Sequence, residues 1–136
     1  MSNILDLALA ANISEPEAVA EAEYQLLLVS AKRKDSKSGN SMVEFSHEIV
    51  GDVLTPPVFY YLILPTDSMP QRDQQRRLLD AKRYCDAFNI PIETFAACVA
   101  DDSFEDIIGS QGWAHLVQNE YEGRISNKIK RFIKSA

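Results

Sequence analysis

Residues 56–64, Pro-Pro-Val-Phe-Tyr-Tyr-Leu-Ile-Leu, contain the most β-prone run of the chain, and residues 72–88 follow with its one long helical pattern. Aromatic and β-branched side chains fill the first run, which predicts a strand that ends at Pro65. The second run repeats apolar residues at spacings of three and four, as on the buried face of a helix. These residues are Leu78, Ala81, Cys85 and Phe88. A strand followed by this helix is therefore the centre of the predicted fold.

Alternation of apolar and polar residues predicts two strands before this centre and two after it. Their ranges are 24–33, 42–50, 112–121 and 124–133. Gly39-Asn40 and Glu122-Gly123 supply turn residues for two hairpins. Trp113 follows a glycine at the start of a strand, and we expect it in the core rather than stacked on a ligand.

The predicted order is thus three strands, a helix and two strands. This is the order of an OB-fold, a mainly β domain with one helix, in which five strands form a Greek-key barrel and the helix lies between strands three and four. A five-stranded α+β sheet of another topology is the alternative. We expect residues 1–20 to form an acidic helical leader, with a helix over residues 4–11, that serves as a mobile arm or as a strap. Residues 21–136 are expected to form the OB-fold domain.

Charge is segregated along the chain. All 14 Lys and Arg residues lie in three windows, at 32–37, 72–83 and 124–134, although the net charge is −6. Such segregation predicts a positive stripe on an acidic body, which attracts a polyanion without a basic net charge. The alternative is that each window is an ion-paired, solvated face, and it applies most of all to the helix.

Length and composition favour one soluble domain. A chain of 136 residues, 46% of them hydrophobic and 25% charged, is typical of globular proteins. No apolar run reaches bilayer length, so we expect no membrane partner, and the N-terminus lacks the basic region of a secretory signal. Cys85 and Cys98 form no disulfide framework, which favours the cytoplasm.

The sequence contains no motif typical of an enzyme. A phosphate-binding glycine loop, a G-x-S-x-G nucleophile motif and zinc-ligand spacing are all missing. The acidic residues at 101–106 precede a strand, and we expect them to be solvated rather than to hold the metal of a nuclease. Catalytic residues, metals and cofactors are therefore not expected.

Several short runs resemble a bacteriophage family catalogued as domain of unknown function 669. At the start of the domain they are Glu23-Tyr24-Gln25, Ala31-Lys32 and residues 36–42, and at its end they are residues 106–109 and 121–124, Asn127 and Phe132. The resemblance covers about residues 20 to 134, and it implies an OB-fold protein that binds single-stranded DNA beside recombination and replication proteins. Two features depart from this pattern: the acidic segment lies at the N-terminus instead of the C-terminus, and the helix is unusually basic.

An OB-fold binds oligonucleotides on strands two and three, between the loops that join strands one to two and four to five. Two of the basic windows fall at these loops. Binding without sequence preference also needs flat side chains that stack on bases. Phe59 and Tyr61 share one face of the third strand and are expected to point outward, with Tyr60 buried; the alternative places all three in the core. The predicted nucleic-acid-binding residues are Lys32, Arg33, Lys34, Lys37, Phe59, Tyr61, Tyr121, Arg124, Lys128 and Lys130.

We therefore expect a protein that binds and protects single-stranded DNA during phage replication or recombination, without sequence preference. Replication or recombination proteins are the further partners to expect, and the oligomeric state is left open. One alternative is an OB-fold adaptor that binds proteins through the acidic leader and does not bind DNA. Another is a small DNA-annealing factor or nuclease.

Overall fold

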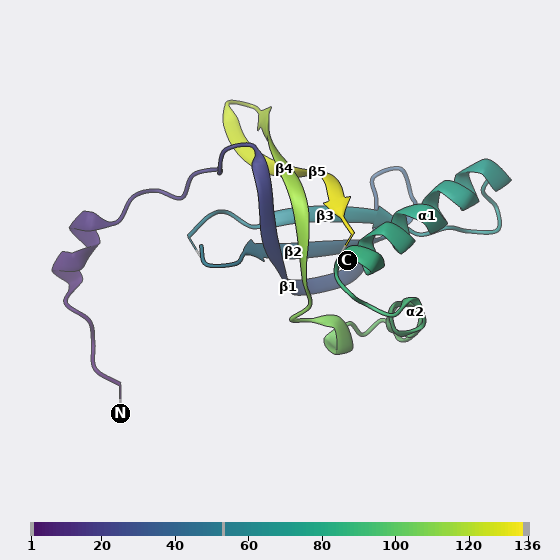
Figure 1. The fold of residues 1–136 in the computed structure, drawn as a ribbon, viewed down its shortest axis with the longest axis horizontal. Coiled ribbons are helices and arrows are strands. Elements are labelled where there is room, and N and C mark those ends of the chain that lie inside the picture. The colour runs from purple at the N-terminus through teal and green to yellow at the C-terminus, as the bar shows by residue number, and fades with distance from the viewer. Residues whose placement is uncertain (1, 53, 135–136) are drawn as a thin grey trace.

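The structure, a computed structural model, describes residues 2–52 and 54–134. Met1, Val53, Ser135 and Ala136, which include the outer limits of the predicted leader and domain, lie outside the described residues. Within these ranges the chain forms five strands, two α-helices and two short 3-10 helices (Figure 1). In chain order they are η1 (Leu7–Asn12), β1 (Ala22–Asp35), β2 (Ser41–Ile49), β3 (Val58–Ile63), α1 (Gln71–Ala87), α2 (Ile92–Asp101), η2 (Glu105–Ile107), β4 (Gln111–Tyr121) and β5 (Arg124–Ile133).

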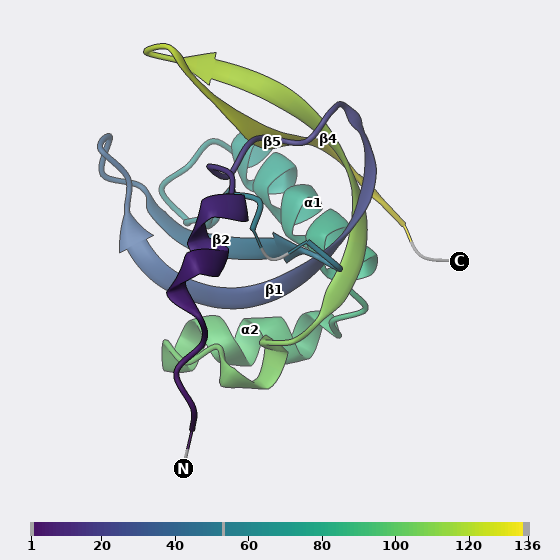
Figure 2. The same ribbon diagram turned by 90° about the vertical axis from the view of Figure 1, so that its left-hand side faces the viewer.

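The five strands form one antiparallel sheet in the order β3-β2-β1-β4-β5. This confirms the prediction of a mainly β domain with five strands and a helix between the third and the fourth. Since every neighbouring pair is antiparallel, the edge strands β3 and β5 run in the same direction. The sheet curves (Figure 2), and Cα atoms of β3 and β5 approach within 8 Å, but no backbone ladder joins their described residues. We call the line between these two edges the seam.

β1 is the strand on which the sheet turns. Its first half pairs with β4 and its second half with β2, and the register shifts between Leu28 and Ser30. Such a bulge bends a strand and increases its twist. The second half of β1 therefore presents Lys32 and Lys34 beside β2, opposite Glu44 and Met42.

Helix α1 closes one end of the curved sheet with a stack of aromatic rings. The ring of Tyr84, which is fully buried, lies 4.1 Å from that of Phe45 on β2 and 4.5 Å from that of Phe88. Ala81 and Cys85 are buried as predicted, but the prediction is wrong for Leu78, which is 52% exposed. The reason is that the N-terminal half of α1 extends beyond the sheet (Figure 1).

A buried histidine links α1 to the sheet. His47 has no exposed surface; its Nδ1 lies 2.8 Å from the carbonyl oxygen of Val58, and its Nε2 lies 2.8 Å from the hydroxyl of Tyr84. Only a ring nitrogen that carries hydrogen can bond a carbonyl, so Nδ1 donates and Nε2 accepts from Tyr84. Burial lowers the pKa of His47 to about 4, so the ring is neutral at neutral pH.

The leader is less helical than predicted. A single 3-10 helix, η1, replaces the expected helix over residues 4–11, and none of its residues is buried. The leader is held at Val19, which packs against the core and whose N–H donates to Asn127 Oδ1 over 2.9 Å. The side-chain amides of Asn127 and Gln118 donate in turn to the carbonyl oxygen of Val19. Val19 thus anchors the end of the leader, and residues 12–17 lie beside Asp52, Leu54 and Thr55. The leader extends away from the sheet on the side opposite α1 (Figure 1).

Helix α2 was not expected from the sequence, which suggested an acidic connection there. Phe95 and Cys98 form its buried face, and Val99 packs against the same core. Asp102 ends the helix in the left-handed conformation, with φ of 51°. The apolar spacing of three and four was present in the sequence, but the run was short and followed Pro91 directly.

Candidate nucleic-acid interface

Strand β3 presents two aromatic rings on the outer face of the sheet. Phe59 is 42% exposed and Tyr61 is 49% exposed, while Val58 and Leu62 are buried. The two rings lie 6.2 Å apart with an angle of 15° between their planes. Alternation along the strand turns Tyr60 inward, where it packs against the core. The prediction that Phe59 and Tyr61 point outward is therefore confirmed.

Two cations of β1 lie beside these rings and share one carboxylate. Glu44 on β2 pairs with Tyr61 on β3 and with Lys32 on β1 in the strand register. Its carboxylate lies 2.6 Å from Lys34 Nζ and 3.6 Å from Lys32 Nζ, and the ammonium of Lys34 lies 5.4 Å from the Tyr61 ring centroid. The hydrogen bond from Lys34 holds the pKa of Glu44 below its usual value. Both lysines are thus positioned next to the aromatic pair, but in competition for one anion.

The residues of the first basic window, 32–37, do not all lie in one loop. Lys32, Arg33 and Lys34 belong to strand β1, so only Lys37 lies in the turn that follows. Alternation separates Arg33 from its neighbours, and its guanidinium lies 3.4 Å from the carbonyl oxygen of Val99 on α2. The structure therefore brings Lys32 and Lys34 to the outer face beside the aromatic rings, and it does not bring Arg33 there.

A groove of about 590 Å³ runs along the seam between β3 and β5. Phe59 and Tyr61 line one side of it, and Ser126 and Lys128 line the other. Pro56, Pro57, Tyr60, Asn119, Asn127 and Ile129 complete the lining. Prolines cannot donate to a backbone ladder, so Pro56 and Pro57 also keep this end of the β3 edge free of strand pairing. The groove, formed from two edges far apart in sequence, was not predicted.

The β4–β5 hairpin continues the side of the groove that carries Lys128. Tyr121 pairs with Arg124 and Val117 pairs with Lys128, so strand alternation places these side chains on one face. Tyr121 is 72% exposed. Lys130 differs, because the register shift next to it removes it from this alternation. Of the predicted residues, Tyr121 and Arg124 lie toward the hairpin tip, and Lys130 lies beyond the groove.

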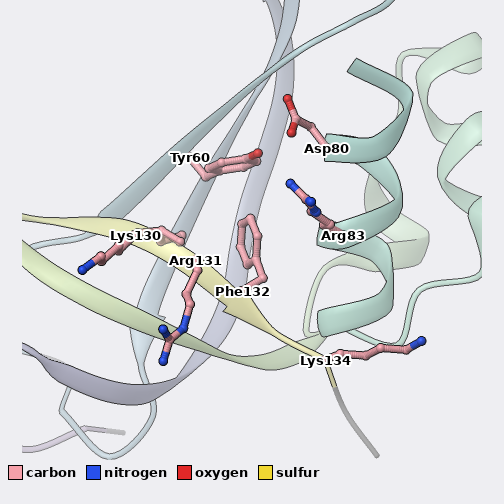
Figure 3. Close-up of a pocket in the computed structure, with 8 residues that line it drawn as sticks. Tyr60, Asp80, Arg83, Lys130, Arg131, Phe132 and Lys134 are labelled. Atoms are coloured by element: carbon pink, nitrogen blue, oxygen red, sulfur yellow. The ribbon is translucent and has the colours of Figure 1, made fainter. Parts of the chain in front are cut away.

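A second hollow, of about 550 Å³, follows further along the seam and reaches α1 (Figure 3). Its lining residues are Tyr60, Asp80, Arg83, Ile129, Lys130, Arg131, Phe132 and Lys134. Burial, and then the nearby carboxylate of Asp80, raise the pKa of Tyr60 to about 12, so its hydroxyl keeps its proton. Part of the basic helix window therefore faces the C-terminal window, and neither the aromatic pair nor Lys32 and Lys34 belong to this hollow.

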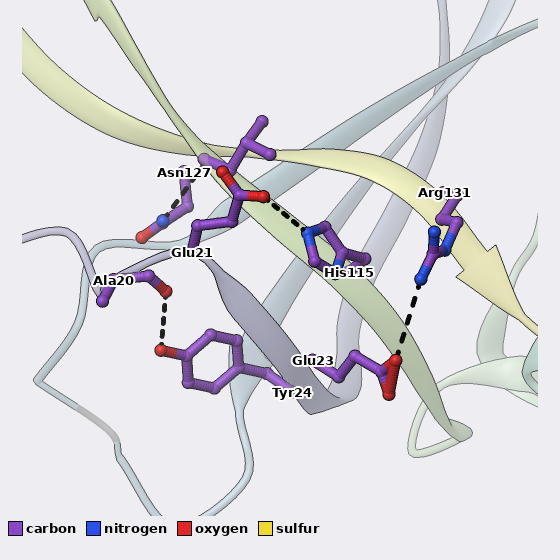
Figure 4. A network of polar contacts seen from close by, with 8 residues as sticks. Ala20, Glu21, Glu23, Tyr24, His115, Asn127 and Arg131 are labelled. Atoms are coloured by element: carbon purple, nitrogen blue, oxygen red, sulfur yellow. Dashed lines mark hydrogen bonds and ion pairs between the residues drawn. The ribbon is translucent and has the colours of Figure 1, made fainter.

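Polar contacts tie the start of β1, and the residue before it, to β4 and β5 (Figure 4). Glu21 accepts from His115 Nε2 over 3.0 Å, and Glu23 lies 3.8 Å from Arg131. Trp113 on β4 is 47% exposed, so the prediction that it lies in the core is wrong. The reason is its neighbour Gly112, whose backbone faces α1 and turns the next side chain outward.

The described part of the chain offers neither a metal cluster nor a membrane-spanning helix. No group of three or more His, Cys, Asp or Glu side chains there could hold a metal ion. No helix in residues 2–52 and 54–134 is long and apolar enough to span a membrane. No protein-family model and no curated protein sequence matches the chain. The resemblance to the phage family therefore stays a prediction.

Proposed function

We propose that this protein binds single-stranded DNA without sequence preference, in the groove along the seam, and that its sheet is an OB-fold barrel of Greek-key topology. The observation that carries the proposal is the exposed, nearly parallel pair Phe59 and Tyr61, which lines a groove opposite Lys128 and has the ammonium of Lys34 beside the Tyr61 ring. The order of strands and the position of α1 support the fold assignment.

Each part of the groove has a task in this proposal. The rings of Phe59 and Tyr61 accept stacked bases, which is tolerant of sequence because every base has a π-face. Lys32 and Lys34 neutralise phosphates on one side, and Lys128 does so on the other. Lys37 and Arg124 extend these two rows of cations toward the turns. Contacts of these cations with the DNA backbone supply affinity without reading the bases.

The cellular role that we propose is protection of single strands during phage replication or recombination, in the cytoplasm of a bacterial host. The resemblance of residues 20 to 134 to the phage family supports this role. The same resemblance supports replication or recombination proteins as partners.

A titration of fluorescent oligothymidylate at several salt concentrations tests DNA binding. Five cations, one phosphate each, give a slope of log affinity against log salt of about −3.5, at roughly 0.7 per contact for a single strand. An equal affinity for oligothymidylate and a mixed sequence is also expected. Absence of binding at about 20 mM salt, or a slope smaller in magnitude than about −1, would exclude this use of the groove. Incubation of the DNA with protein and magnesium, followed by electrophoresis, tests for a nuclease.

A change at Glu44 should strengthen binding. Glu44→Gln removes the carboxylate that competes with DNA phosphate for Lys32 and Lys34, so we expect affinity at low salt to rise about fivefold, or roughly 1 kcal/mol. Glu93→Gln on α2 makes the same change in net charge away from the groove, and it should leave the affinity within about a factor of two. Equal effects of the two variants would mean that only net charge matters.

A second function, protein binding, is favoured by the leader. Ile4 is 91% exposed, and Leu5 and Leu7 are each 78% exposed. Apolar side chains grouped on a protruding arm are typical of a segment that a partner protein covers. If the oligonucleotide titration fails, an adaptor that acts through this arm becomes the leading function.

A further inference from the structure

The hollow between α1 and β5 lies at the end of the groove, and its lining contains more cations than carboxylates. Arg83, Lys130, Arg131 and Lys134 line it, against the single carboxylate of Asp80. Asp80 already lies 3.7 Å from Arg77, and Arg131 lies 3.8 Å from Glu23. Among the described residues, Arg83 and Lys130 form no ion pair within 4.0 Å. The pKa of Glu21 is lowered by its hydrogen bond with His115 and also by the charge of Lys130, and that of Asp86 by Lys82 and also by Lys134, so these two carboxylates partly offset the charge. The lining itself still holds four cations against one carboxylate.

The hollow and the groove are successive parts of one surface. Both are lined by Tyr60 of β3 and Ile129 of β5. Because β3 and β5 run in the same direction, the groove lies at the start of the seam and the hollow at its end. From Ser126 to Ile133 the distance along β5 is roughly 23 Å, at about 3.3 Å per residue. A chain that leaves the groove in the direction of β5 therefore arrives at α1.

The arrangement of the charges suits an extended anion rather than a small one. In Figure 3 the Arg83 side chain comes from the helix side, while the side chains of Lys130, Arg131 and Lys134 spread outward from β5. A site for free phosphate would need several donors aimed at one point. Cations distributed around a rim can instead contact successive phosphates of a strand that crosses it.

We propose that the hollow binds the phosphodiester backbone of the same single strand whose bases stack on Phe59 and Tyr61, with Arg83 and Lys134 as its principal contacts. This inference rests on the proposed function, because it assigns the route of the bound strand beyond the groove. Helix α1 is then part of the DNA-binding surface, and only strands long enough to reach it use this part.

The test compares the double variant Arg83→Ser/Lys134→Ser with the double control Arg72→Ser/Lys82→Ser, which removes the same charge from α1 at positions that line neither the groove nor the hollow. Lys82 is the neighbour of Arg83 but pairs with Asp86 over 2.9 Å and does not line the hollow. Each protein is titrated with oligothymidylates of about 4 and about 16 nucleotides, the ends of the range for one OB-fold. Circular dichroism on heating verifies that each variant is folded, which is expected because all four side chains are exposed.

For the long oligonucleotide, the Arg83/Lys134 variant should bind at least fivefold more weakly and lose about 1.4 from the magnitude of the salt slope, at about 0.7 per phosphate. Its affinity for the short one should stay within twofold of wild type. An unchanged affinity for the long oligonucleotide would overturn the inference. So would an equal loss for both lengths, or a length-dependent loss in the control as large as in the variant. If wild-type protein binds neither oligonucleotide, the proposed function itself fails, which is a separate result.

Discussion

Replacement of both Phe59 and Tyr61 by alanine is expected to weaken oligothymidylate binding by about 30-fold or more. Each stacked base contributes on the order of 1–3 kcal/mol, so two lost platforms cost about 2–6 kcal/mol, and the lower limit corresponds to about 30-fold. Both rings are about half exposed, at 42% and 49%, so their removal leaves little space in the core. Anisotropy titrations at low salt measure the affinity, and thermal unfolding confirms that the variant folds.

Trp113→Ala is the matched control for this experiment. Trp113 is 47% exposed on the outer face of the same sheet but does not line the groove. Its removal should change the affinity by less than about twofold. If the Phe59/Tyr61 variant binds like wild type while folded, stacking in the groove is excluded. If Trp113→Ala loses as much as the pair, the strand follows another path over the sheet.

Substitution of Gly112 by alanine is expected to destabilise the fold by about 3 kcal/mol, near the upper end of the usual range for overpacking. A Cβ atom at this position would lie 2.5 Å from the carbonyl oxygen of Ala87 and 2.9 Å from the ring of Phe88. The carbonyl belongs to the backbone at the end of α1 and cannot move alone, so the helix must shift away from β4. Urea denaturation measures the loss in the free energy of unfolding. In thermal unfolding, the same loss should lower the melting temperature by roughly 10 °C.

Gly39→Ala separates this clash from the general effect of a lost glycine. Gly39 lies in the β1–β2 turn with φ of 87°, and nothing lies within 4 Å of its added Cβ. Alanine there should cost about 1 kcal/mol through backbone strain alone. A Gly112→Ala protein as stable as Gly39→Ala would show that α1 does not press on β4 as described.

The strands were predictable because their sequences alternate, and the same alternation identified Phe59 and Tyr61 as the exposed pair. Alternation does not show which face of a strand is buried where another element, such as a helix, packs against it. Trp113 turns outward because α1 occupies the space over Gly112, and the sequence does not record that contact. Helix α2 was missed because it is short: its apolar residues repeat at helical spacing over only 10 residues. The leader was expected to be a helix, but residues 2–17 are exposed, so it lacks the tertiary packing that stabilises short helices.

The site was predictable only in part, because it combines neighbours in a strand with partners distant in sequence. The basic windows indicated Lys32 and Lys34, which lie on the outer face near Tyr61, and Lys128, which lines the groove. Arg33 was included with them, although alternation directs it toward α2. Glu44 was not recognised as their shared partner, since that contact depends on the register of β1 with β2. The groove itself depends on the approach of β3 to β5, which no local pattern encodes.

The open seam has a consequence for the DNA binding that we propose. No backbone ladder joins the described residues of β3 and β5, so the two edges can separate slightly without breaking strand hydrogen bonds; the edge-on contact of Tyr60 with Phe132, 4.8 Å between centroids, crosses between them. In the proposed complex, a gap that can widen would admit large and small bases at similar cost. Indifference to sequence would then come from the elasticity of the scaffold as well as from the chemistry of stacking.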